Sequence, residues 1–253
     1  MREITSSSNS YIKELRSLRS KKHRTHLKRY LIEGSRTVEE ALKGAALIES
    51  VITCDPDNEV ALQAEKRGLD VILVPRPILL TLSDTKTPPD VLGCLLKESE
   101  QAEPESGLVV ICDDVQDPKN LGAIIRTADA CGAAGVIVSP ESADPYGPKC
   151  QRAAMGSMFH LPVTIREPGS YLRGFKARGG KVVAGLLEGT SALGAVRENT
   201  AVVVGNEARG VSQEVRELAD IAYRIPIYGR AESLNAAVAA GIMMYDIARR
   251  LKG

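Results

Sequence analysis

The stretch Leu-Val-Val-Ile-Cys-Asp-Asp at residues 108–114 opens the larger part of the chain and indicates its fold class. Five consecutive apolar residues that end in two carboxylates are typical of a strand buried on both faces. Similar short apolar runs follow it, separated by segments long enough for helices. The predicted strands are 108–112, 136–138, 181–184, 201–204 and 223–225, and the predicted helices lie near 120–131, 148–156, 170–178, 213–219 and 234–251. This alternation predicts an α/β domain with a parallel sheet covered on both faces.

Upstream, the sequence predicts a smaller α/β domain. Strand patterns at 30–32, 48–53, 71–74 and 91–96 alternate with helical patterns around Val38 and over 60–67. The segment 97–107 contains four Glu and one Pro and shows no hydrophobic periodicity, so it is typical of a solvated linker. We therefore expect domains at residues 1–96 and 108–253, joined by a linker at 97–107.

Composition narrows the class of protein. The 253 residues are 43% hydrophobic and 26% charged, which is ordinary for a globular chain. No apolar run approaches the ~20 residues of a membrane span, and the polar N-terminus lacks a signal-peptide core, so we expect a cytoplasmic protein. Five scattered Cys without a C-x-x-C pair, and three His outside any ligand pattern, predict reduced thiols and no metal site.

Basic residues are concentrated at the N-terminus. Residues 1–36 hold ten Lys or Arg against three Glu, whereas the rest of the chain is acidic. Tyr11, Leu15 and Leu18 recur at helical spacing, which predicts an amphipathic helix docked by that stripe with its cations outward. Such a run is either a solvated helix face or a surface for a polyanion such as an RNA backbone, and charge alone leaves both open.

Three loops that follow predicted strands contain unusual polar residues. Ligands of parallel sheets bind beyond the carboxyl ends of the strands, so these loops are the candidate ligand site. In the first, Asn120 is placed as a helix N-cap. Arg126 is the only charge between residues 121 and 128, and a desolvated guanidinium there would have to pair with a carboxylate, carbonyls or a phosphate.

The other two loops follow later strands. Residues 205–210, Gly-Asn-Glu-Ala-Arg-Gly, contain glycines that would allow a ligand to approach the backbone, although they match no phosphate-binding fingerprint. Ser233 is placed as the N-cap of the last helix, with Glu232 and Asn235 beside it. No G-x-S-x-G elbow accompanies Ser233, so it is not expected to be a hydrolase nucleophile.

Together and in this order, the three segments resemble the SpoU family of RNA ribose methyltransferases over residues 108–250. The matching residues are Asn120, Gly122, Arg126, Thr127, Ala128, Gly205, Asn206, Glu207, Gly210, Ile225, Pro226, Ser233, Leu234 and Asn235. The segments 152–156 and 161–163 are similar to the middle of that family. Asn9, Lys13, Lys21, Lys22 and residues 31–34 resemble the substrate-binding domain that often precedes it.

The resemblance implies a fold and a reaction. The fold is a parallel-sheet domain whose C-terminal segment forms a trefoil knot, preceded by a substrate-binding α/β domain like ribosomal protein L30e. The reaction transfers a methyl group from S-adenosylmethionine to a ribose 2′-oxygen, in a homodimer and without a metal. The implied cofactor-binding residues are Gly205, Asn206, Ile225, Pro226, Ile227 and Leu234, with Gly185 and Leu186 nearby, and the implied active-site residues are Asn120, Arg126, Glu207, Ser233 and Asn235.

The closing helix supports the expectation of a homodimer. It is small or apolar nearly all round, and Val238, Ile242 and Tyr245 recur at spacings of four and three. One apolar stripe serves the domain's own core, so a second stripe leaves surface for another chain.

For the N-terminal domain we expect RNA contacts from Lys13, Lys21, Lys22 and Arg24. Ribosomal RNA is the favoured substrate, and tRNA is the alternative. Two other classes stay open: a non-catalytic RNA-binding member of the fold, and a nucleotide- or NAD-dependent enzyme, which the missing phosphate fingerprint disfavours. The proton acceptor is also open, because Arg126 keeps its charge; a substrate phosphate could take the proton, or Arg126 could only orient the ribose.

Overall fold

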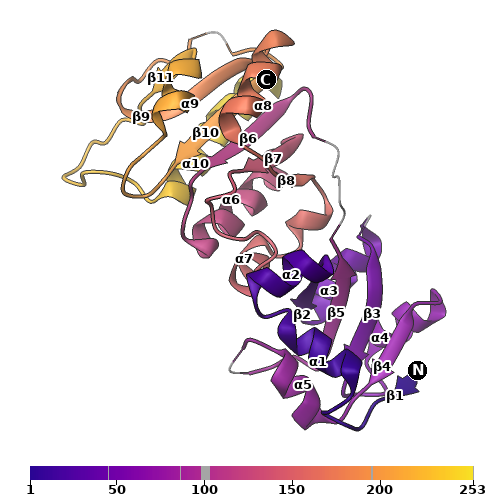
Figure 1. Cartoon of the computed structure of the whole chain (residues 1–253). Helices are drawn as coiled ribbons and strands as arrows, with labels where there is room; N and C mark the ends of the chain where they lie inside the picture. Colours follow the sequence, from indigo (N-terminus) through magenta and orange to yellow (C-terminus); the bar gives the residue numbers. More distant parts are fainter. Residues whose placement is uncertain (45, 86, 98–102, 195, 253) are drawn as a thin grey trace. The chain divides into compact units, whose positions relative to one another are not determined.

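The computed structural model describes residues 1–44, 46–85, 87–97, 103–194 and 196–252 (Figure 1). The chain forms two compact units: Met1–Glu100 with Tyr146–His160, and Gln101–Pro145 with Leu161–Gly253. Residues 98–102 of the predicted linker lie outside the described residues.

The first unit contains a mixed five-stranded sheet. Its strands lie in the order β1 (Arg2–Glu3), β4 (Asp70–Leu73), β3 (Ile48–Thr53), β5 (Val91–Leu96) and β2 (Arg29–Glu33). Strands β1, β4 and β3 are parallel to one another, whereas β5 is antiparallel to both β3 and β2. The four longer strands are where the apolar runs predicted them, and only the two-residue β1 was missed.

Five helices complete the N-terminal part of this unit: α1 (Ser10–Ser17), α2 (Lys21–Leu27), α3 (Ser35–Lys43), α4 (Glu59–Lys66) and α5 (Arg76–Leu82). The predicted amphipathic helix is confirmed as α1, whose Ile12 and Leu15 are fully buried in a core cluster with Leu79 of α5. The sequence analysis missed α5 because prolines surround its start. Pro77 lies in the first turn, where a missing N–H costs nothing.

A segment from far along the chain also belongs to the first unit. Helix α7 (Pro148–Ala154) and the short 3₁₀ turn η1 (Ser157–Phe159) follow Tyr146, whose ring lies 4.9 Å from that of Tyr30. The Lys97 ammonium lies 4.6 Å from the Tyr146 ring centroid. This grouping was not predicted, because the segment lies in sequence between two strands of the other unit.

The second unit contains a six-stranded sheet in which every neighbouring pair is parallel. Its order is β11 (Ile221–Tyr223), β9 (Lys181–Thr190), β10 (Thr200–Gly205), β6 (Leu108–Asp113), β7 (Gly135–Val138) and β8 (Val163–Ile165). The predicted parallel sheet is thus confirmed, although β8 was missed. The strand predicted at 223–225 lies two residues earlier in the structure, as β11 at Ile221–Tyr223, so only Tyr223 of the predicted range belongs to it.

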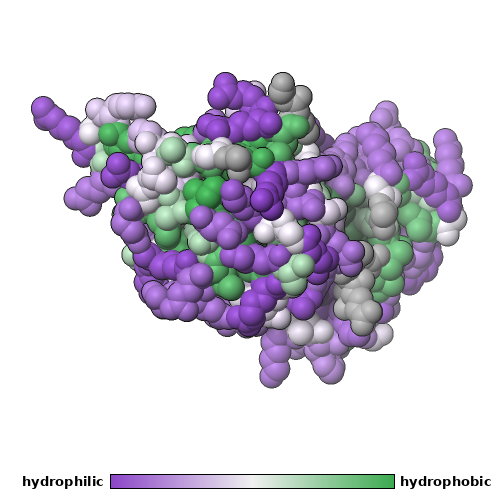
Figure 2. All heavy atoms as spheres, turned by 90° about the horizontal axis from the view of Figure 1, so that it is seen from above, coloured by the Kyte–Doolittle hydropathy of each residue, from purple (hydrophilic) through white to green (hydrophobic). Residues whose placement is uncertain are grey.

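Helices cover both faces of this sheet. On one face, α8 (Pro168–Ala177) and α9 (Gln213–Leu218) bury Phe175 and Val215 against Val109 and Ile111 of β6. On the other face, α10 (Ala236–Lys252) contacts β10 and packs against α6 (Pro118–Ala130). Hydrophilic residues dominate the one molecular face drawn in Figure 2, with apolar residues in patches between them.

The strand order brings two of the three unusual loops together. From β6 the chain runs outward through β7 and β8, then returns to the other side of the sheet, so β10 pairs with β6. This reversal creates a switch point at which the loops after β6 and β10 lie side by side, the usual position of a ligand site in such sheets.

Candidate active site

The loop after β10 closes on itself. Asn206 and Gly210 exchange two backbone hydrogen bonds of 3.0 and 2.9 Å, and Gly210 has φ +70°. A Cβ on Gly205 would lie 2.3 Å from the carbonyl carbon of Gly210. Both glycines therefore serve the closure of the loop itself, whereas the sequence analysis assigned them to the close approach of a ligand.

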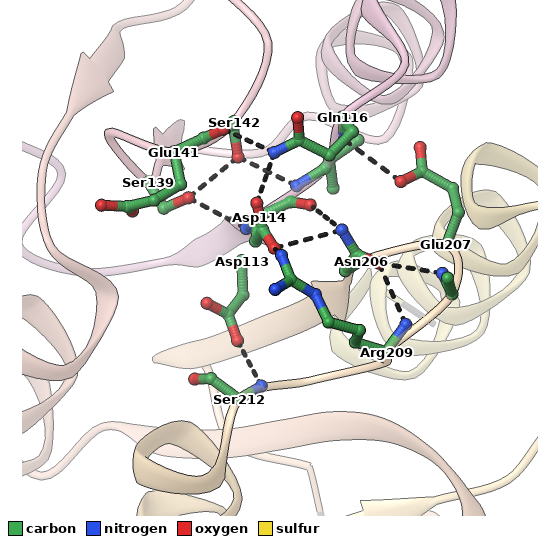
Figure 3. Close-up of polar contacts among 12 residues, drawn as sticks. Asp113, Asp114, Gln116, Ser139, Glu141, Ser142, Asn206, Glu207, Arg209 and Ser212 are labelled. Carbon is green, nitrogen blue, oxygen red and sulfur yellow. Dashed lines mark hydrogen bonds and ion pairs between the residues drawn. The ribbon is translucent and has the colours of Figure 1, made fainter.

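This loop is fastened to the loop after β6 (Figure 3). Asn206 Nδ2 donates to the carbonyl oxygen of Asp114 at 3.0 Å and to its Oδ2 at 3.1 Å. The Arg209 guanidinium forms an ion pair with the same carboxylate. Below them, the Ser212 backbone N–H donates to Asp113 Oδ2 at 2.7 Å.

Glu207 joins the two loops at the start of α6. Its Oε2 accepts from the backbone N–H of Gln116 at 3.1 Å, and its Oε1 accepts from the backbone N–H of Asp117 at 3.2 Å and from Asn120 Nδ2 at 2.9 Å. Partial burial acts to raise the pKa of Glu207, but these hydrogen bonds outweigh it and lower the pKa overall. Glu207 is therefore an ionised acceptor at neutral pH.

Asn120 and Asn235 continue this chain of hydrogen bonds, because Asn235 Nδ2 donates to Asn120 Oδ1 at 2.9 Å. The expected capping roles were wrong for two residues. Helix α6 starts earlier than predicted and is capped by Asp117, which accepts from the Lys119 N–H at 2.8 Å, so Asn120 lies inside the helix. Asn235, rather than Ser233, accepts from the N–H of Ala237 at 2.9 Å and so caps α10.

Arg126 lies on the exposed side of α6 and makes no hydrogen bond or ion pair with any residue that the structure describes. The expectation of a desolvated guanidinium was therefore wrong, because the apolar residues around it in sequence, such as Ile124 and Ile125, face the core instead; of the expected partners, a phosphate is still compatible with this position. Arg126 is left free to bind an anionic or hydroxyl group of a ligand.

A cavity of about 120 Å³ opens at the same edge of the sheet. Its lining comes from the middle of β9, the ends of β10 and β11, the segment between β11 and α10, and the first half of α10. The lining residues are Gly185, Leu186, Leu187, Val204, Tyr223, Arg224, Ile225, Ile227, Ser233, Leu234, Ala239 and Met243. Of the cofactor residues proposed from sequence, Ile225, Ile227 and Leu234 are in this set, whereas Gly205, Asn206 and Pro226 are not.

Several cavity residues were not singled out from sequence. Met243 and Ala239 belong to α10, and only the packing of that helix brings them to the ends of the strands. Tyr223 is buried and donates a 3.0 Å hydrogen bond to Asp246, so it contributes its ring rather than its hydroxyl. Leu187 of β9 is 65% exposed, whereas Val182, Val183 and Ala184 of the same strand are fully buried.

The lining suits S-adenosylmethionine in chemical character. Its walls are mainly apolar, which suits the adenosine part of the cofactor, and Arg224 is the single charged residue among those that line it. Within the described ranges, no group of three or more His, Cys, Asp or Glu side chains could hold a metal ion, and no helix is long and apolar enough to cross a membrane.

The cations predicted to contact RNA divide into two sets. Lys13, Lys21 and Lys22 are exposed on α1 and α2. Arg24 is only 6% exposed, and its Nη1 donates to the carbonyl oxygens of Leu18 and Arg19 at 2.7 and 2.9 Å. The interpretation of Arg24 as an outward cation was therefore wrong, because its guanidinium satisfies carbonyls left open at the end of α1.

Comparisons with known proteins agree with this architecture. The SpoU rRNA Methylase family model matches residues 107–245, and a model for an MRM3-like substrate binding domain matches residues 9–93. The 23S rRNA (guanosine(2553)-2′-O)-methyltransferase RlmP of Bacillus subtilis (strain 168) is 36% identical over 250 residues, which are 98% of this chain and 99% of that protein. The 23S rRNA (uridine(2479)-2′-O)-methyltransferase of Streptomyces viridochromogenes is 30% identical over 266 residues, 98% of this chain and 92% of that protein.

Among solved structures, the AdoMet-bound rRNA methyltransferase from Sinorhizobium meliloti superposes with a TM-score of 0.89 at 34% identity, covering 100% of this chain and 99% of that one. The resemblance seen in the three loops thus extends over both units. The chain belongs to the SpoU rRNA methylase family.

Proposed function

We propose that this protein transfers a methyl group from S-adenosylmethionine to a ribose 2′-hydroxyl of ribosomal RNA. The family membership and the 23S rRNA substrates named for both relatives support this function. One observation in the structure carries it: an apolar cavity lies at the carboxyl ends of β10 and β11, and the loop after β10 is joined through Glu207 to the hydrogen-bonded side chains of Asn120 and Asn235. Because those relatives act on a guanosine and a uridine, the base is not part of the proposal.

Each residue has a task in this proposal. Ile225, Ile227 and Leu234 provide apolar walls for the adenosine part of the cofactor. Gly205 follows the lining residue Val204 in the chain, and Pro226 lies between Ile225 and Ile227, so we keep these two and Asn206 as cofactor-binding residues of the proposal. When bound, S-adenosylmethionine supplies an electrophilic methyl group. Asn120 and Asn235 fix the geometry near the reacting oxygen, and the exposed Ser233 offers a hydroxyl at the cavity wall. Placement of this kind accounts for several kcal/mol of a transfer barrier.

Arg126 is the catalytic residue of the proposal. A guanidinium keeps its proton at neutral pH, so Arg126 orients the ribose and stabilises the negative charge that develops on its oxygen. Glu207 is ill-suited as a base, because three hydrogen bonds hold its carboxylate and lower its pKa.

Mapping 2′-O-methylation across total RNA tests the function directly. A deletion strain should lose methylation at one ribosomal position, and the wild-type gene should restore it whereas an Arg126→Ala gene should not. Loss at a tRNA position would replace the proposed substrate class, and an unchanged map would contradict the function. Because the substrate is ribosomal RNA, we propose the cytoplasm as the compartment.

We also propose that two chains form the active enzyme. Val238, Ile242 and Tyr245 lie along one side of α10 and are 51%, 40% and 69% exposed. An aliphatic and aromatic stripe of this kind on a helix end is typical of an interface. In sedimentation, Ile242→Glu should convert a dimer to a monomer and lower activity, whereas Lys66→Glu on the exposed side of α4 should do neither.

The remaining parts of the proposal concern topology and domain roles. We propose that the C-terminal segment of the second unit is threaded through a loop as a trefoil knot, which the family membership supports. We further propose residues 1–96 as the RNA-binding domain and 108–253 as the catalytic domain, supported by the two family models that match residues 9–93 and 107–245.

A further inference from the structure

Asp114 has a backbone conformation that its position in the fold does not explain. Its φ is +64°, and the other non-glycine residues with positive φ in the described chain are Lys28 and Met155. Those two are the C-caps of α2 and α7, where the left-handed conformation is common. Asp114 instead directly follows β6. A non-glycine residue in this region persists only where its surroundings hold it, and such residues cluster at functional sites.

All the polar atoms of Asp114 are engaged (Figure 3). Its backbone N–H donates to Ser139 Oγ at 2.9 Å, and its carbonyl oxygen accepts from Asn206 Nδ2 at 3.0 Å. One carboxylate oxygen accepts from Gln116 Nε2. The other accepts from Asn206 Nδ2 at 3.1 Å and from Arg209.

The partners of Asp114 hold Glu207 in two ways, through Asn206 in its own loop and through Gln116 in the loop after β6. Asn206 Oδ1 accepts from the N–H groups of Ala208 and Arg209 at 2.9 and 3.0 Å, so Asn206 sets the shape of the loop that carries Glu207. Gln116, which donates its side chain to Asp114, also donates its backbone N–H to Glu207 at 3.1 Å. The left-handed turn at Asp114 therefore aims both its carbonyl and its carboxylate at the loop after β10.

We propose that Asp114, with Arg209, is a positioning residue for methyl transfer: it holds Glu207 where the Glu207 carboxylate fixes Asn120 and, through it, Asn235. This inference rests on the proposed function. Among the described residues, the hydrogen-bond partners of Asp114 are Ser139, Gln116, Asn206 and Arg209, and none of them lines the cavity, so we expect Asp114 to act on the orientation of the reacting groups rather than on cofactor binding.

The test uses the full-length protein and compares turnover, KM for S-adenosylmethionine and thermal stability. Asp114→Gly keeps the left-handed backbone without strain and deletes the side-chain contacts. We expect kcat to fall about tenfold or more, KM for S-adenosylmethionine to change less than about twofold, and the melting temperature to move by no more than a few degrees. Asp114→Asn, which tolerates this conformation and keeps one oxygen acceptor, should fall between wild type and Asp114→Gly.

A double-mutant cycle identifies the route of the effect. If Asp114 acts through Glu207, adding Asp114→Gly to Glu207→Gln should lower kcat by less than about twofold beyond Glu207→Gln alone. Arg173→Ala is the matched control, because it removes an ion pair with Glu214 in the same unit without touching either loop, and its kcat should equal that of wild type.

The outcomes separate this inference from the function on which it rests. An active wild type with multiplicative losses in the double variant, or with unchanged kcat in Asp114→Gly, overturns the positioning role alone. Loss of stability in Asp114→Gly with kcat per folded molecule unchanged also overturns it. A wild type that methylates no RNA overturns the proposed function and the positioning role with it.

Discussion

The two sheets of the protein place their polar side chains differently. In the mixed sheet of the first unit, polar groups bind inside the fold: the Tyr11 hydroxyl lies 2.8 Å from Ser50 Oγ, and Cys94 Sγ donates to Glu49 Oε2 at 3.3 Å. Burial raises the pKa of both Tyr11 and Cys94, so they stay neutral and structural. In the parallel sheet of the second unit, the polar network lies at the carboxyl edge, around Glu207.

The difference follows from strand direction. Parallel strands deliver all their carboxyl ends to one edge, so loops distant in sequence meet there. In the first unit the carboxyl ends do not all meet at one edge, because β5 is antiparallel and its carboxyl end lies at the opposite edge from those of β3 and β2.

The largest expected effect in the second unit comes from removing the exposed guanidinium of Arg126 on α6. Arg126→Ala should lower methyl transfer by about 10²–10³-fold or more, since a charge that stabilises the developing oxyanion is lost. Affinity for S-adenosylhomocysteine, measured by calorimetry, should stay within a few-fold because Arg126 is outside the cavity lining. Retained turnover, or cofactor binding lost in step with activity, would contradict the role.

In the first unit, the largest expected effect is on stability rather than on activity. Arg24→Ala leaves the Leu18 and Arg19 carbonyls without their donor and should lower the free energy of unfolding by about 1–3 kcal/mol. Denaturant titration measures it, and Lys22→Ala on the exposed side of the same helix is the control. Equal stability of the two variants would show that the hydrogen bonds from Arg24 to the Leu18 and Arg19 carbonyls do not stabilise the fold.

A smaller effect should appear in RNA binding. The double variant Lys21→Ala/Lys22→Ala removes two exposed cations, so RNA affinity should weaken and its dependence on log salt should flatten by about 1.4–1.8. Cofactor affinity and stability should not change. Filter binding at several salt concentrations measures the slope, and an unchanged slope would assign RNA binding to other residues.

The smallest effect concerns pH. The folded pKa of Glu207 is lowered, so its contribution to stability is present above its unfolded pKa of about 4.3 and is lost as pH falls through the folded value. The difference in melting temperature between wild type and Glu207→Gln should therefore be largest near pH 7 and shrink below about pH 4. A constant difference across this range would show that the hydrogen bonds do not depend on the charge of Glu207.

Much of the molecule could be predicted from local pattern. The parallel sheet followed from short apolar runs such as 108–112, because strands buried on both faces must be apolar throughout. Helix α1 followed from a stripe at helical spacing. The order of three polar loops indicated the family, because their residue types and spacings agree over a long span of chain.

The sequence by itself determined the elements, the parallel sheet and the residue types at its edge, since these depend on neighbours a few positions apart. Only the tertiary structure decided which groups the polar side chains bind. Asn120 proved to be a link to Glu207, 87 residues away, rather than a cap, and Arg24 proved to be an internal donor rather than a surface cation. The partner of a polar side chain depends on which distant segment folds against it. Strand order decides which segments are neighbours in space, and local residue spacing does not contain that information.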